Sequence, residues 1–140
     1  MKISARNILA GKVDKVIKGA VSAEIDLTLD GGETVVATIT NVSANALGLT
    51  TGTPAFAIIK ASEVIIGKDV QAGKFSARNI LHGVVANVED GAVNSEVVIQ
   101  LPGGSQIAAS ITKASVHALE LKVGDNVSAI IKASNVIIGV

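Results

Sequence analysis

A short polar stretch, Ser-Ala-Arg-Asn, occurs twice in this chain, at residues 4–7 and 76–79. Each copy is followed by an Ile-Thr-x-x-Ser stretch, which places Thr40 and Ser43 in the first copy, and later by Lys-Ala-Ser, which in the first copy is residues 60–62. The matched Ser, Thr, Arg and Lys side chains all donate hydrogen bonds, and the set contains no carboxylate. Such a donor set suits a bound oxyanion. In the structural alternative, the hydroxyl groups cap turns and strand ends while the cations pair with nearby acids.

The two polar sets belong to a duplication that covers nearly the whole chain. Residues 3–67 align with residues 75–139 without a gap, and roughly half of the paired positions are identical. We therefore predict two domains, 1–68 and 74–140, joined by a linker at 69–73 that is too short to let them move freely. Domains of about 65 residues bury only about 60% of their surface on folding. We expect them to pack against each other or against other subunits.

The pattern within each repeat predicts five strands and one short helix. Residues 24–29 alternate polar with apolar side chains, as in a half-buried strand. The glycine pairs at 31–32 and 103–104 favour hairpin turns, and they lack the spacing of a phosphate-binding loop. Ser43 and Ser115 suit the N-cap positions of helices at 44–47 and 116–119. Short turns and antiparallel pairing predict an all-β protein built from two tandem OB-like five-stranded antiparallel β-barrels.

The composition argues against several classes of function. Twelve basic and twelve acidic residues give a formal net charge of zero, and aromatic residues are 1% of the chain. An OB-like nucleic-acid reader needs a basic groove with aromatic platforms, so we expect no nucleic-acid partner. Cysteine is absent, which excludes disulfides and thiolate ligands. No apolar run approaches the ~20 residues of a membrane span, and no signal peptide is evident, so we expect a soluble, cytoplasmic protein with no membrane partner.

Catalytic residues are not expected. His82 aligns with Ala10 and His117 with Asn45, whereas a duplicated active site would keep its general base in both copies. Glu24 aligns with Glu96, but carboxylates on the polar side of an alternating strand are usually solvated. No nucleophilic triad, carboxylate pair or metal-ligand group recurs. We predict a protein that is not an enzyme, has no cofactor and coordinates no metal ion directly.

Taken together, the Ser-Ala-Arg-Asn stretch, the Gly-Gly hairpin, Ile-Thr-x-x-Ser-x-x-x-Leu-x-Leu and Lys-Ala-Ser-x-Val-Ile-Ile resemble the Mop domain of the molbindins, a family of molybdate-binding proteins. The match extends over both repeats. The resemblance implies an OB-like barrel and a compact homo-oligomer, a trimer for tandem units, with molybdate held at interfaces between Mop domains. It also implies a role in molybdenum storage or homeostasis in the cytoplasm.

The resemblance also implies which residues bind the oxyanion. One unit would contribute Ser4 and Arg6 with the backbone amides around them, and an adjoining unit Thr40, Ser43 and the stretch from Lys60. The second repeat would contribute the matching residues. The full set is Ser4, Arg6, Asn7, Thr40, Ser43, Lys60, Ala61, Ser62, Ser76, Arg78, Asn79, Thr112, Ser115, Lys132, Ala133 and Ser134.

The protonation state of the anion favours molybdate as the ligand. Molybdate is a full dianion near neutral pH, whereas phosphate is partly protonated and its proton would oppose a donor in a pocket of donors. Sulfate would have to be rejected by size, and tungstate, which is nearly the same size as molybdate, should bind too. Two other hypotheses stay open: an oxyanion-sensing regulatory module that acts through a partner protein, and a purely structural oligomerisation module.

Overall fold

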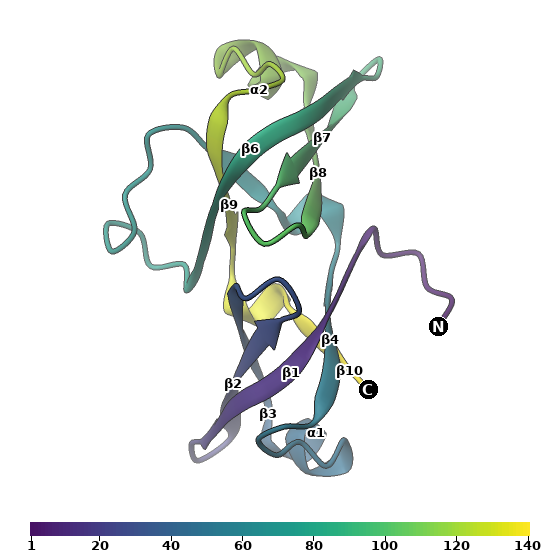
Figure 1. Cartoon of the computed structure of the whole chain (residues 1–140), viewed down its shortest axis with the longest axis vertical. Coiled ribbons are helices and arrows are strands. Elements are labelled where there is room, and N and C mark those ends of the chain that lie inside the picture. The colour runs from purple at the N-terminus through teal and green to yellow at the C-terminus, as the bar shows by residue number, and fades with distance from the viewer.

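The structure, a computed structural model, describes all residues from 1 to 140 and consists of two similar β-units stacked along the long axis of the molecule (Figure 1). The elements of the first repeat are β1 (Asn7–Lys18), β2 (Ser22–Leu29), β3 (Thr34–Thr40), α1 (Asn41–Ala46), β4 (Pro54–Ile59), the 3₁₀-helix η1 (Ala61–Glu63) and β5 (Ile65–Gly67). Those of the second repeat are β6 (Asn79–Asp90), β7 (Asn94–Gln100), β8 (Gln106–Thr112), α2 (Lys113–Ala118), β9 (Asn126–Ile131), the 3₁₀-helix η2 (Ala133–Asn135) and β10 (Ile137–Gly139).

The predicted fold class is confirmed, since the chain forms two five-stranded antiparallel sheets with one short α-helix in each repeat. Strand β2 shows why: its buried and part-exposed residues alternate along its length, so one face packs on the core and the other faces outward. The core is a single cluster of 29 buried residues drawn from both repeats. Because the chain is poor in aromatic residues, this core is aliphatic.

The last strand of each repeat belongs to the sheet of the other repeat. The strand orders are β10-β4-β1-β2-β3 and β5-β9-β6-β7-β8, so β5 pairs with β9 and β10 pairs with β4. In Figure 1 the yellow C-terminal strand accordingly runs into the half that contains β1. The sequence repeats and the two sheets therefore differ by one strand each, and the exchange ties the halves into one unit.

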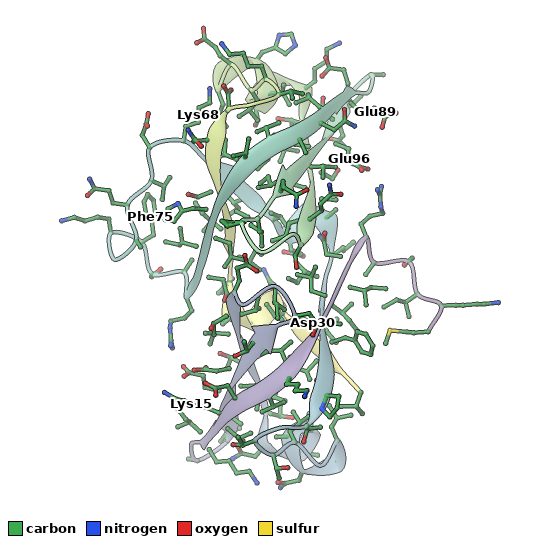
Figure 2. The ribbon with its side chains drawn as sticks, viewed as in Figure 1. Lys15, Asp30, Lys68, Phe75, Glu89 and Glu96 are labelled. Carbon is green, nitrogen blue, oxygen red and sulfur yellow. The ribbon has the colours of Figure 1, made fainter.

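Further contacts hold this arrangement. Within the second half, the Nζ atom of Lys68, which follows the exchanged strand β5 and is labelled in Figure 2, lies 3.0 Å from Oδ2 of Asp125 in the loop before β9. The hydrogen bond from Lys68 also lowers the pKa of the Asp125 carboxyl. The Gly-Gly hairpins of the two repeats touch, because a Cβ atom built on Gly103 would lie 2.1 Å from the carbonyl oxygen of Gly31. The first glycine of each pair thus permits this contact, and the second, at φ +101 in both hairpins, forms the turn.

The prediction that Ser43 caps α1 is wrong. The helix begins at Asn41, and the N-cap is Thr40, whose backbone is extended and whose Oγ1 accepts a hydrogen bond from the backbone N–H of Ser43 at 3.0 Å. The second repeat does the same with Thr112 and Ser115. The residue that leaves the strand already has the extended backbone that an N-cap requires, so the helix begins earlier than the serine suggested.

Candidate functional site

The Ser-Ala-Arg-Asn stretches lead into β1 and β6, and their asparagines, which are the first residues of these strands, connect the two repeats. Asn7 is buried; its side chain donates to the carbonyl of Ala108 at 2.8 Å and accepts from the N–H of the same residue at 2.7 Å. Asn79 makes the matching pair with Val36, at 2.8 and 2.7 Å, and also donates to the carbonyl of Ile131 at 3.2 Å. The side-chain amides of Asn7 and Asn79, which we predicted to bind the anion, therefore hydrogen-bond to backbone groups of this chain.

The arginines of the same stretches pair with carboxylates of the opposite repeat. Arg6 donates from both Nη atoms to Glu96 on β7, with Nη2 at 2.7 Å from Oε1. Arg78 donates from Nη1 to Glu24 on β2, and this hydrogen bond raises the pKa of Arg78. The expectation that Glu24 and Glu96 are merely solvated is therefore wrong. Their recurrence in both repeats was the sequence signal that could have identified them.

A pocket of about 290 Å³ brings part of the predicted set together. The residues before β6 and those around the start of η2 line it from the second repeat, and Thr38 of β3 lines it from the first. Lys132 is exposed and forms no salt bridge, so its ammonium group is available to a ligand. The lining residues are Thr38, Ser76, Ala77, Arg78, Lys132, Ala133 and Ser134.

The pocket is lined by donors and contains no carboxylate. Three hydroxyl groups, one guanidinium and one ammonium group face the same hollow. Such a donor set suits an oxyanion, because hydrogen bonds between charged donors and an anion are stronger than those between neutral groups. Thr38 was not among the predicted residues. It occupies the outward face of β3, two residues before Thr40, and only the packing of η2 against β3 brings it to the site.

The predicted residues of the first repeat are arranged similarly but line no shared pocket. Ser4, Arg6, Lys60 and Ser62 are exposed, and η1 packs against β8 as η2 packs against β3. The counterpart of Thr38 is Ser110, which lines a different hollow together with Glu96 and other residues of the β6–β7 hairpin. The two repeats therefore present the same donors in surroundings that differ.

Thr40, Ser43, Thr112 and Ser115 do not enter the pocket. They are held at the N-termini of α1 and α2, where each threonine and serine hydroxyl pair also hydrogen-bonds at 2.9 and 2.8 Å. The two helices lie at opposite ends of the long axis in Figure 1. Within one chain the structure thus groups the Ser-Ala-Arg-Asn stretch with the Lys-Ala-Ser stretch of the same repeat, and separates both from the Ile-Thr-x-x-Ser stretch.

Asp26 distinguishes the surroundings of Arg78. Its Oδ1 atom is buried and has no hydrogen-bond partner. Burial raises the pKa of the Asp26 carboxyl, as does the negative charge of Glu24, whereas Lys15 and Arg78 act in the opposite direction. The second repeat has Val98 at the equivalent position. The Arg78 side therefore carries one more acidic group than the Arg6 side.

Other features bear on alternative functions. His82 is exposed, and its Nδ1 lies 2.7 Å from Oγ of the buried Ser128, whereas the exposed His117 makes no side-chain hydrogen bond. No group of three or more His, Cys, Asp or Glu side chains is placed to hold a metal ion. Neither α-helix has the length or the apolar character needed to cross a membrane.

Fold and site together define the class of this protein: a duplicated OB-like β-protein with clusters of hydrogen-bond donors at the contacts between its repeats. The TOBE domain family matches residues 3–66 and 76–138, that is, both repeats. The chain belongs to this family, and the resemblance to Mop-domain proteins is confirmed.

The chain is similar over its full length to the crystal structure of the cytoplasmic molybdate-binding protein ModG with molybdate bound. The two share 48% sequence identity at a TM-score of 0.96, and the match covers 100% of this chain and 99% of the other. Among curated relatives, it is 42% identical over 140 residues to the molybdenum transport protein ModE of Herbaspirillum seropedicae. It is 43% identical over 138 residues to the molybdenum-pterin-binding protein MopA of Rhodobacter capsulatus. The chain spans about half the length of these curated relatives, 52% of each.

Proposed function

We propose that this protein binds molybdate, and also tungstate, as a non-catalytic cytoplasmic molybdenum store. The observation that carries the proposal is the pocket in which Thr38, Ser76, Arg78, Lys132 and Ser134 come together with no carboxylate in its lining. The likeness to ModG, described as a cytoplasmic molybdate-binding protein, supports it over the full chain. Molybdenum would be bonded only to its own oxygens, and the side chains would contact those oxygens.

The chemistry of the pocket supports a fully ionised dianion as the ligand. Every polar side chain lining it can donate, and none is a carboxylate that would accept a proton from the ligand. Phosphate that carries a proton would place this donor against another donor and lose a hydrogen bond. Molybdate and tungstate have no proton near neutral pH, and their size separates them from sulfate.

We further propose that the protein assembles into a homotrimer and that neighbouring chains contribute to the sites. Ile65 and Ile137 lie on the edge strands β5 and β10 and are 61% and 62% exposed. Exposed isoleucines on free strand edges favour association with another chain. The residues on either side of them, Val64 and Ile66 in one run and Val136 and Ile138 in the other, are buried. Ile65 and Ile137 are therefore the residues of these runs that can contact another chain. If a site spans two chains, bound anion will stabilise the assembly by mass action.

Titration calorimetry of the anion-free protein tests the binding proposal. We expect molybdate and tungstate to bind, and sulfate and phosphate not to bind. Arg78→Ala and Lys132→Ala each remove a charged hydrogen-bond donor, which should weaken molybdate binding by about tenfold to a hundredfold. Lys12→Ala is the matched control, because it removes one exposed positive charge from β1 and Lys12 does not line the pocket.

Two results would contradict the proposal. Equal molybdate affinity in the wild type, Arg78→Ala and Lys132→Ala would refute the site, and no binding of any oxyanion by the intact protein would refute the function. Light scattering on the same samples gives the mass of the assembly, and a mass other than that of three chains would refute the trimer.

A further inference from the structure

The arginine of each donor cluster is already engaged by an anion that belongs to the protein. Glu96 holds Arg6, and Glu24 holds Arg78. The arginine side chains are 57% and 56% exposed, whereas the glutamates are 29% and 25% exposed. The carboxylates are thus the more firmly packed partners, and the guanidinium groups are the ones free to turn towards a ligand.

A carboxylate on the same guanidinium competes with an incoming oxyanion in two ways. It occupies N–H donors that the oxyanion would use, and its negative charge repels a dianion placed beside it. Both pairs link one repeat to the other, since β2 and β7 supply the glutamates while the stretches before β6 and β1 supply the arginines.

The two pairs are unequal. Arg6 is held through both Nη1 and Nη2, whereas Arg78 is held through Nη1 alone, which leaves its second Nη for a ligand. The surroundings of the two arginines also favour ligand binding at Arg78. Arg78 lines the 290 Å³ hollow with Lys132, and no pocket gathers Arg6 with Lys60.

We propose that Glu96 and Glu24 are internal competitors for the bound anion, and that the Arg78 site fills before the Arg6 site. The inference rests on the proposed function. A dianion entering the Arg78 pocket can use the second Nη of Arg78 and the ammonium group of Lys132, neither of which is in an ion pair, and these donors act against the repulsion from Glu24 and Asp26. At Arg6 it must first displace a two-point contact, because a paired guanidinium and carboxylate fit one another at both Nη atoms. The glutamates therefore set the order of filling and the concentration at which each site responds.

Substitution of each glutamate by glutamine tests the competition. Glutamine keeps the size of the side chain and removes its charge. The coupling of an exposed ion pair corresponds to a change of about two- to fivefold in an equilibrium constant. We expect Glu96→Gln to raise the molybdate affinity of the weaker site by about this factor, and Glu24→Gln to raise the affinity of the stronger site by less.

Glu89→Gln is the matched control for these variants. Glu89 is the cross-strand neighbour of Glu96, is exposed and forms no ion pair. Figure 2 shows the two glutamates on the same part of the upper sheet. Glu89→Gln therefore removes an equal charge from the same region without freeing an arginine, and should leave molybdate affinity unchanged within twofold.

Nitrogen-15 NMR of the guanidinium groups identifies which site responds. In wild-type protein the Arg78 signals should shift at lower molybdate concentration than the Arg6 signals, and Glu96→Gln should bring the two midpoints together. Unchanged or weaker binding in both glutamine variants would overturn the competition, because the glutamates would then be positioning the arginines. Simultaneous shifts in the wild type would overturn the order of filling. If wild-type protein bound no molybdate, the proposed function would fail and this inference with it.

Discussion

The two halves of this molecule share a fold and a set of polar residues, but Arg78 lines a pocket and has both Glu24 and Asp26 nearby, whereas Arg6 lines no pocket and is bound by Glu96 at both Nη atoms. The difference arises because each cluster is composite. Arg78 belongs to the second repeat, yet Glu24, Asp26 and Thr38, which surround it, belong to the first. Divergence in one repeat therefore alters the site of the other.

What the halves keep in common is mostly contact with the backbone. The side chains of Asn7 and Asn79 hydrogen-bond to main-chain groups of the other repeat, and we call these contacts the asparagine clamps. Main-chain groups stay in place when side chains change. The halves differ in contacts between side chains. Val98 replaces Asp26, and His82 and Ser128 occupy the positions of Ala10 and Phe56 in the first repeat. Three changes measure how far the equivalence of the halves extends.

Loss of the asparagine clamps should have the largest effect. Asn7→Ala leaves the N–H and C=O of Ala108 without partners, and we expect a loss of about 3 kcal/mol in the free energy of unfolding. Asn79→Ala also strips a hydrogen bond from Ile131, and should cost about 1 kcal/mol more. Urea denaturation measures both values. Since one core joins the repeats, each variant should unfold in a single transition.

Ser4→Ala and Ser76→Ala control for changes in the same stretches. Both serines are exposed and make no side-chain hydrogen bond within the chain, so each substitution should alter stability by less than about 0.5 kcal/mol. Equal losses in Asn7→Ala and Asn79→Ala would mean that the third hydrogen bond of Asn79 contributes nothing. Two separate unfolding transitions would contradict the single core.

The His82–Ser128 contact should contribute less. It exists only in the second repeat, and His82→Ala would leave the buried Ser128 hydroxyl without a partner, at a cost of about 1 kcal/mol. His117→Ala is the comparison, because that imidazole is exposed and unbonded, and it should change stability by less than about 0.5 kcal/mol. Thermal unfolding of the two variants, side by side, decides the matter. Equal stabilities of the two variants would show that the hydrogen bond between His82 and Ser128 contributes nothing to the stability of the fold.

Sequence patterns predicted the elements of the fold well, but they did not predict that the last strand of each repeat joins the sheet of the other repeat. Alternation and glycine pairs located the strands and hairpins, because those signals are local. The exchange of β5 and β10 is not encoded in this way. The two strands have the same sequence, and their partners at 56–58 and 128–130 share Ala-Ile and differ only at Phe56 and Ser128, each of which lies opposite a glycine. Pairing within a repeat or across repeats would therefore bring nearly the same residues together, and the local sequence does not distinguish the two.

The candidate site was predictable as a set of residues but not as a geometry. Matched Ser, Arg and Lys pointed to donors for an anion. Thr38 was not predicted, and Glu24 and Glu96 were noted as a matched pair but interpreted as solvated, because all three come near the arginines only across the repeat contact. Asn79 matched as well as Arg78 did, and a repeat alignment alone cannot tell a buried clamp from an exposed donor.

The smallest effect, and the one that most directly separates the halves, is the pH dependence due to Asp26. Because burial and Glu24 raise its pKa above the ordinary value of 3.8, the folded state binds the proton more tightly than the unfolded state. Asp26 therefore lowers stability as pH rises from 3.8 through the raised pKa. The groups that face it are Glu24, Lys15 and Arg78, while its neighbour on β3, Val36, is uncharged.

Asp26→Val gives the first repeat the side chain that the second repeat already carries. The variant should be more stable than wild type at pH 7, with the gain shrinking as the pH is lowered towards 3.8, where the unfolded carboxyl also becomes protonated. Urea denaturation at several pH values between these limits measures the difference. The reciprocal Val98→Asp should lower stability at neutral pH. A gain in Asp26→Val that stayed constant with pH would mean that the valine acts through apolar packing, and that the acidic surroundings of Arg78 do not distinguish the two halves.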